Sequence, residues 1–336
     1  HAAAYDLGYL SAGRLVERLE NMFSTLAGLE RHRGHFYNWY DTRTLLPLHP
    51  HYVSTVDSGN LAGHLLVLRQ ALLDLPDEPL FDPRRFEGLA DAAAMLPEPP
   101  RAGREARQRL DRALAEARGA SFASLHEAAE VAARIADAAE AARDACAPDP
   151  DGDEAFWFEA LIAQCRDVAA GFEAFALPDG APDDLLLPTL RRLAEADPDS
   201  LPEEMREKAR SARERAAALT EACRSLAERA ADMASMDFGF LYDAQRELLS
   251  IGYNVQEQRL DASYYDLLAS EVRLTYFVAI AQGQLPQESW FALGRLLTAN
   301  NGTPTLLSWS GSMFEYLMPM LVMPSCERTL LDEACR

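Results

Sequence analysis

The feature that most constrains the fold of this sequence is the recurrence of apolar residues at helical spacing along most of its 336 residues. Ala, Leu, Glu and Arg dominate these segments, and few segments alternate between apolar and polar residues as strands do. We therefore expect an all-α fold built as an array of helical hairpins. Closed into a ring, such an array is an α/α toroid; a flat bundle or an open solenoid is the alternative.

Prolines and polar clusters divide the pattern into individual helices. We predict one amphipathic helix over residues 10–29, a second that Ser58 caps and that runs through Leu72, and a third from about Ser263 to Ala281. Residues 101–235 form a block rich in Ala, Glu, Asp and Arg, in which we predict several long helices broken at residues 148–152, 178–188 and 198–202. We expect residues 1–336 to form a single toroid domain, with 101–235 a variable block inside it.

Charge and length exclude several classes of function. The net charge is −21, which argues against nucleic acid or an anionic membrane as the main partner, because phosphate groups require basic patches. A neutral ligand is easier to reconcile with this charge. The longest candidate for a membrane span, residues 313–323, is too short and contains Glu315 and Pro319. The sequence begins at His1 without an initiator Met and stops at Arg336 inside a predicted helix, so we expect a piece of a longer chain.

Cysteine and histidine spacing gives no sign of a metal site. The five cysteines are an odd number without metal-site spacing, and we expect scattered buried thiols. The seven histidines form no HxxxH or HExxH pattern, and the pair His49 and His51 beside Pro50 is weak support for a metal. We expect no metal and no cofactor.

Two blocks, residues 34–64 and 236–319, are rich in aromatic, amide, hydroxyl and carboxylate side chains. This mixture suits sugar binding, because aromatic faces stack on a pyranose ring while polar side chains bind its hydroxyl groups. The alternative is a set of polar loops that cap helices. Candidate substrate-binding residues from the two blocks are Tyr37, Trp39, Asp41, Asp57, Asn60, Tyr253, Asp266, Trp309 and Glu315, with Tyr264 and Trp290 as further stacking platforms.

Cleavage or transfer of a glycosidic bond requires two carboxyl groups beside the anomeric carbon. Glu271 is the leading catalytic candidate because apolar neighbours flank it, and burial would raise its pKa. A surface Glu paired with an Arg is the alternative. Glu315 lies at the third position of a helix that Ser312 can cap, so a capping box is at least as good an interpretation as catalysis. Asp57 is a candidate sugar-hydroxyl ligand.

Several blocks together resemble cyclic β-1,2-glucan synthases, in the helical region between the glycosyltransferase part and the phosphorylase-like part. The matching blocks are residues 34–43, 52–64, 240–243, 251–254, 260–271 and 307–319, and they cover about half of the chain. The resemblance implies an (α/α)6 toroid like glucoamylase, acting on linear β-1,2-glucan by retaining transglycosylation that closes the chain into a ring.

On this resemblance Glu271 matches one of two essential carboxylates, and the other lies beyond Arg336. The toroid in this chain is then C-terminally incomplete, and we expect the fragment alone to be inactive. The resemblance also implies glycosyltransferase and phosphorylase-like neighbours in the same polypeptide, at the cytoplasmic face of the bacterial inner membrane. An endo-β-1,2-glucanase-like hydrolase and a non-catalytic glucan-binding module are the alternatives.

Overall fold

The computed structural model describes residues 1–178, 180–300 and 302–336, and these residues are predominantly helical. They form no closed sheet, so the predicted all-α class is confirmed, and the arrangement is consistent with a toroid of helical hairpins. The helices of the described chain are α1 Ala2–Asp6, α2 Ala12–Ala27, α3 Thr55–Asp74, α4 Arg84–Ala94, α5 Arg104–Gly119, α6 Leu125–Cys146, α7 Asp153–Glu173, α8 Leu190–Ala194, α9 Glu203–Ala234, α10 Val272–Ala281, α11 Glu288–Ala292, α12 Met313–Leu317 and α13 Leu330–Cys335.

The strands are short, and each pairs locally or within a small sheet. Three two-stranded sheets, β1–β2, β4–β5 and β8–β9, and one three-stranded sheet of order β3-β6-β7 are present in the described ranges. The strands are β1 Arg31–His32, β2 His35–Phe36, β3 Tyr52–Ser54, β4 Tyr242–Asp243, β5 Leu248–Leu249, β6 Gly252–Asn254, β7 Arg259–Leu260, β8 Leu297–Asn300 and β9 Thr303–Leu306.

The chain divides into two compact units. The first comprises residues 1–22 and 71–226, and the second comprises residues 23–70 and 227–336. All the candidate site residues lie in the second unit. The single toroid domain expected from the sequence stays a prediction.

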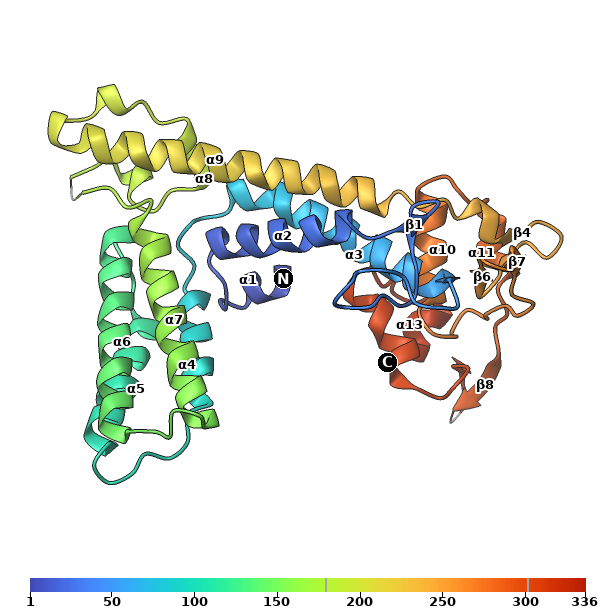
Figure 1. The fold of residues 1–336 in the computed structure, drawn as a ribbon, viewed down its shortest axis with the longest axis horizontal. Coiled ribbons are helices and arrows are strands. Elements are labelled where there is room, and N and C mark those ends of the chain that lie inside the picture. The colour runs from blue at the N-terminus through green and yellow to red at the C-terminus, as the bar shows by residue number, and fades with distance from the viewer. Residues whose placement is uncertain (179, 301) are drawn as a thin grey trace. The chain divides into compact units, whose positions relative to one another are not determined.

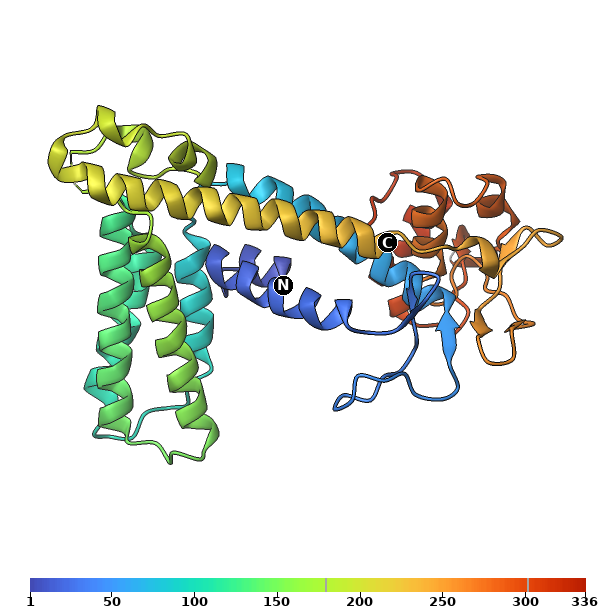
Figure 2. The same ribbon diagram turned by 45° about the horizontal axis from the view of Figure 1, so that its top comes forward.

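The first unit is built around α4, α5, α6 and α7. Figures 1 and 2 show these helices side by side, and each of them packs against two of the others. The buried face of α6 is made mostly of alanines at helical spacing, and the small side chains allow close approach of α5 and α7. The predicted breaks at 148–152, 178–188 and 198–202 are confirmed as the connections that follow α6, α7 and α8, although Asp179 lies outside the described residues.

In the second unit α3 crosses α10 at a glycine. A Cβ atom built on Gly59 of α3 would lie 2.5 Å from the Cα atom of Thr275 in α10, so the two backbones touch where a side chain has no room. Gly63, one turn later in α3, packs on the side chain of Leu274. This close contact fixes the N-terminal half of α3 against the helix that follows Glu271.

The three-stranded sheet joins the two polar, aromatic blocks of the sequence. Strand β3 pairs antiparallel with β6, with Ser54 opposite Gly252 and Tyr52 opposite Asn254. A Cβ atom on Gly252 would lie 2.4 Å from the Cζ atom of the Tyr52 ring, so this ring can cross the backbone of β6 only at a glycine. No alternating pattern predicted strands here, and the sheet is a finding of the structure.

Two of the predicted helix boundaries are wrong. Helix α3 begins at Thr55, so Ser58 lies inside it, and its hydroxyl donates to the carbonyl of Ser54 instead of capping the helix. Residues 263–271 are not helical, and α10 begins at Val272. The helix expected over residues 10–29 is found as α2.

Among the described residues, no helix is both long enough and apolar enough to cross a membrane.

Candidate active site

Glu271 lies immediately before α10, at a backbone break that the sequence does not reveal. The side chain of Asp266 accepts from the Leu268 amide at 3.1 Å, which closes a turn, and Ser270 has a left-handed φ of 51°. Both features interrupt the helix expected over 263–281. As a result Glu271 lies at the N-terminus of α10, where the helix dipole favours a negative charge.

Ser270 connects Glu271 to Glu315. Its hydroxyl donates to the Glu271 carboxylate, and its amide donates to the Glu315 carboxylate at 3.2 Å. Both Glu side chains are buried, with 8% and 4% of their surface exposed. The structure therefore brings together two carboxylates that are 44 positions apart in the sequence (315 − 271 = 44).

Glu315 is held as an anion by surrounding donors. Burial alone would raise its pKa, but the amide of Ser310 at 3.0 Å, its hydroxyl at 2.8 Å and the Ser270 amide together hold the pKa below the ordinary value. Ser312 does cap α12, by accepting from the Phe314 amide. The predicted capping box, however, is wrong, because the Glu315 carboxylate accepts hydrogen bonds from Ser310 and Ser270.

Asp266 and Trp309 lie beside this pair. Burial raises the pKa of Asp266, and the charge of Glu315 adds to the effect, although the bond from the Leu268 amide opposes it. The amide of Trp309 donates to the carbonyl of Leu268 at 3.1 Å, while 69% of the Trp309 side chain remains exposed. Trp309 directly precedes Ser310, which binds the Glu315 carboxylate, and an exposed indole at this place is suited to stacking on a sugar ring.

Sequence reasoning passed over Tyr265 in favour of its neighbour Tyr264. Burial raises the pKa of Tyr265, and the charges of Asp57, Glu271 and Asp261 raise it further. Asp57 is exposed in the first turn of α3. Tyr265 therefore lies within electrostatic reach of Asp57, Glu271 and Asp261, and the role of Asp57 as a ligand for a sugar hydroxyl stays a prediction.

Asn60 lies in α3, one turn after Asp57, and Tyr253 lies in β6. The Oδ1 atom of Asn60 is buried and has no hydrogen-bond partner within the described ranges, so it is an acceptor without a donor. Tyr253 of β6 pairs with Val53 of β3, and its ring stacks on His32 at 5.7 Å between centroids. This stacking occupies one face of the Tyr253 ring.

Tyr37, Trp39 and Asp41 lie in a separate loop. Tyr37 is 7% exposed and its ring packs on His51 and Tyr40, which favours a structural role. The Asp41 carboxylate accepts from the amides of Thr44 and Arg43, and these two bonds lower its pKa. Trp39 is 53% exposed. The roles of these residues stay predictions.

The arrangement is suited to acid–base or nucleophilic chemistry on a neutral polyhydroxylated ligand. It combines buried carboxylates, hydroxyl donors and an exposed indole. In the parts of the chain that the structure describes, no group of three or more His, Cys, Asp or Glu side chains is placed to hold a metal ion.

We expect Glu315→Gln to lower the free energy of unfolding by about 1–3 kcal/mol at pH 7, because an amide group turned toward Ser310 and Ser270 leaves buried donors unpaired. Since the folded-state pKa of Glu315 is depressed, its contribution is present above the ordinary value of 4.5 and is lost as pH falls through the lower folded value. Urea unfolding followed by tryptophan fluorescence between pH 3 and pH 7 measures both effects. The exposed Glu257→Gln is the control, and equal stability of the two variants at pH 7 would contradict the role given to Glu315.

No family model matches the sequence. The chain is 34% identical, over an alignment of 350 residues that covers 98% of it, to the cyclic beta-(1,2)-glucan synthase NdvB of Rhizobium meliloti (strain 1021). It spans 11% of the length of that protein. Nearly the whole of this chain is therefore similar to one segment of a cyclic beta-(1,2)-glucan synthase.

Proposed function

We propose that this chain is part of a cyclic β-1,2-glucan synthase and that it acts in the step that closes linear β-1,2-glucan into a ring. The observation that carries the proposal is the placement of Glu271: a buried carboxylate at a helix N-terminus that accepts a hydrogen bond from Ser270, the residue whose amide binds Glu315. The similarity to a protein named for this synthesis supplies the substrate class.

In the proposed reaction Glu271 is the nucleophile of a retaining transglycosylation. It attacks the anomeric carbon, the glycosidic bond breaks, and a glycosyl–enzyme ester forms; a hydroxyl at the other end of the same glucan then displaces Glu271 and closes the ring. The second carboxylate protonates the leaving oxygen, and in retaining enzymes it lies about 5–5.5 Å from the nucleophile. On the resemblance described above, that role belongs to a residue beyond Arg336. Glu315 is poorly suited to it, because it is already bonded to three donors and its lowered pKa opposes proton donation.

Incubation of linear β-1,2-glucan with the natural polypeptide at full length tests the proposal, with chain length and reducing ends followed together. Ring formation without new reducing ends supports transglycosylation. New reducing ends identify a hydrolase. Binding of glucan without any change in it identifies a non-catalytic module. The chain of residues 1–336, assayed in parallel, is expected to be inactive because we place the proton donor outside it.

We expect Trp309→Ala to weaken β-1,2-glucan binding by about fivefold, because a lost aromatic stack is worth about 1 kcal/mol. Since the indole is largely exposed, the melting temperature should not change. Isothermal titration calorimetry with linear β-1,2-glucan measures the affinity. Phe156→Ala, which removes a similarly exposed ring from the first unit, is the matched control. Identical affinities for both variants would remove Trp309 from the binding site.

The neighbouring glycosyltransferase and phosphorylase-like domains, and a location at the cytoplasmic face of the bacterial inner membrane, are parts of the same proposal. They follow from the resemblance described above.

A further inference from the structure

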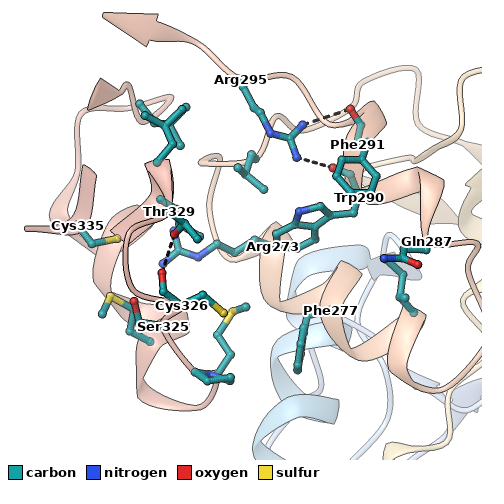
Figure 3. Close-up of a pocket in the computed structure, with 18 of the residues that line it drawn as sticks. Arg273, Phe277, Gln287, Trp290, Phe291, Arg295, Ser325, Cys326, Thr329 and Cys335 are labelled. Carbon is teal, nitrogen blue, oxygen red and sulfur yellow. Dashed lines mark hydrogen bonds between the residues drawn. The ribbon is translucent and has the colours of Figure 1, made fainter. Parts of the chain in front are cut away.

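A buried arginine follows Glu271 by two residues. Arg273 is the second residue of α10, and only 1% of its surface is exposed. Figure 3 shows its side chain in the wall of a cavity of about 610 Å³ that Trp290 and Cys335 also line. A guanidinium is buried only where hydrogen bonds compensate for the water that it has lost, so the partners of Arg273 indicate what it does.

The hydrogen bonds of Arg273 go to the backbone of α12. Its guanidinium donates to the carbonyl of Glu315 at 3.1 Å and to the carbonyl of Tyr316. Pro319 has no amide hydrogen, so the Glu315 carbonyl, four residues earlier, lacks its usual α-helical donor. Arg273 supplies this donor from α10. It therefore fixes the C-terminal end of α12, a helix of five residues that is too short to be stable by itself.

These contacts close a ring that includes the candidate nucleophile. Glu315, whose carbonyl accepts from Arg273, binds the amide of Ser270 with its carboxylate at 3.2 Å. Ser270 donates its hydroxyl to the carboxylate of Glu271, and the chain then reaches Arg273 two residues later. The direction of the Glu271 carboxylate therefore depends on the position of α12.

The backbone of Ser270 requires support of this kind. Its φ of 51° lies in the left-handed region, which costs free energy for a residue with a Cβ atom and persists only where the surroundings impose it. The hydrogen bond from the Ser270 amide to Glu315 acts directly on this backbone. If α12 shifts, Ser270 can relax to an ordinary conformation, and its hydroxyl then moves away from Glu271.

We propose that Arg273 is a positioning residue for the transglycosylation proposed above, and the inference rests on that proposed function. By holding α12 in place, Arg273 lets Glu315 keep Ser270 in the left-handed conformation. The Ser270 hydroxyl in turn orients the Glu271 carboxylate toward the anomeric carbon. Arg273 itself does not contact the glucan, because its guanidinium is buried and donates to carbonyls.

Arg273→Lys in the natural full-length polypeptide tests this role. An ammonium group is a compact point charge and cannot span two adjacent carbonyls as the planar guanidinium does. Because a misplacement of about 1 Å can cost about 100-fold in rate, we expect kcat for ring formation to fall by about 10- to 100-fold. KM for linear β-1,2-glucan should change by less than about threefold, since Arg273 does not reach solvent.

Arg85→Lys is the matched control. Arg85 is 4% exposed in α4 of the first unit, and its guanidinium also donates to backbone carbonyls, those of Tyr5 and Leu10. The control reproduces the loss of a buried guanidinium bonded to carbonyls, outside the candidate active site. It should lower the melting temperature, as Arg273→Lys does, but leave kcat per folded molecule unchanged. Equal losses of kcat in the two variants would overturn the positioning role.

A double-mutant cycle shows whether Arg273 acts through Ser270. Ser270→Ala removes the hydroxyl that binds Glu271, so we expect a loss of kcat similar to that of Arg273→Lys. Since both changes release the same carboxylate, the double variant should be little slower than either single variant. Additive losses would overturn the proposal. An unchanged kcat in Ser270→Ala would also overturn it, and this can be measured even if Arg273→Lys does not fold.

Failure of the proposed function gives a different pattern of results. If Glu271→Gln still forms rings, Glu271 is not the nucleophile, and the positioning role falls together with the proposed function. If Glu271→Gln is inactive while Arg273→Lys keeps its kcat, only the positioning role is overturned. Hydrogen–deuterium exchange adds a measurement that does not depend on activity: the Ser270 amide should exchange faster in Arg273→Lys but not in Arg85→Lys, and equal exchange would contradict the proposal.

Discussion

Glu271→Gln in the full-length polypeptide is expected to lower the formation of cyclic β-1,2-glucan by at least about 1,000-fold. The amide keeps the size of the carboxylate and can still accept the hydrogen bond from Ser270, so the local structure should be retained. It cannot form a glycosyl ester, and it carries no negative charge to stabilise an oxocarbenium-like transition state. Chain-length analysis of the glucan products measures the loss, and linear glucan should accumulate in place of rings.

Glu257→Gln is the matched control for this experiment. Glu257 is exposed in the turn between β6 and β7 and pairs with Arg259 at 2.8 Å, so its replacement should leave ring formation unchanged. If the Glu271 variant forms rings at the rate of the unmodified polypeptide, Glu271 is not catalytic. That result would support the interpretation of this chain as a glucan-binding module. Unchanged thermal unfolding of the variant shows that the loss is chemical and not structural.

Gly59→Ala should produce the largest loss of stability in the second unit. The new Cβ atom would lie 2.5 Å from the Thr275 Cα atom, and because the obstacle is backbone, α3 and α10 must move apart. Overpacking of a tight helix contact typically costs about 1–3 kcal/mol, and we expect the upper end of that range here. Hydrogen–deuterium exchange of α3 and α10 peptides should therefore increase, and the N-terminus of α10, next to Glu271, should become mobile.

Gly13→Ala is the counterpart in an open position. A Cβ atom on Gly13, inside α2, meets nothing within 4 Å, and replacing a helical glycine by alanine typically stabilises by about 0.5–1 kcal/mol. The two substitutions are chemically identical and should change stability in opposite directions. Equal exchange rates in α10 of the Gly59 variant and the unmodified chain would show that the contact is not rigid.

The helices were predictable because their signals are local. Proline and polar clusters at 148–152 and 198–202 end helices by removing amide donors or restricting the backbone, and the structure has connections at these places. The β3–β6 sheet was not predictable, because three-residue strands are too short to show an alternating pattern. Their pairing depends on a partner far away in the sequence.

The site was predictable by residue type but not by geometry. Residue type and family resemblance singled out Glu271, and Glu315 stood among the candidate ligands, yet their connection through Ser270 depends on a left-handed backbone that sequence propensity disfavours for a serine. Asp266 carried a usable signal, because an Asp side chain often accepts from the amide two residues later and so forms a turn, as it does here with Leu268. Tyr265 had no signal, since only the fold brings it within electrostatic reach of Asp57, Glu271 and Asp261.

The pairing of Tyr52–Ser54 with Gly252–Asn254 also bears on how this polypeptide can be assembled and how it can vary in length. During synthesis the sheet cannot close until the ribosome has released residue 254, so helices from the intervening residues can form before the site exists. The entropy of closing so long a loop rises only slowly with its length, by about 0.6 kcal/mol for each doubling. Insertions or deletions between β3 and β6 therefore impose little penalty on the pairing itself, and the intervening segment is free to change in length while the site is retained.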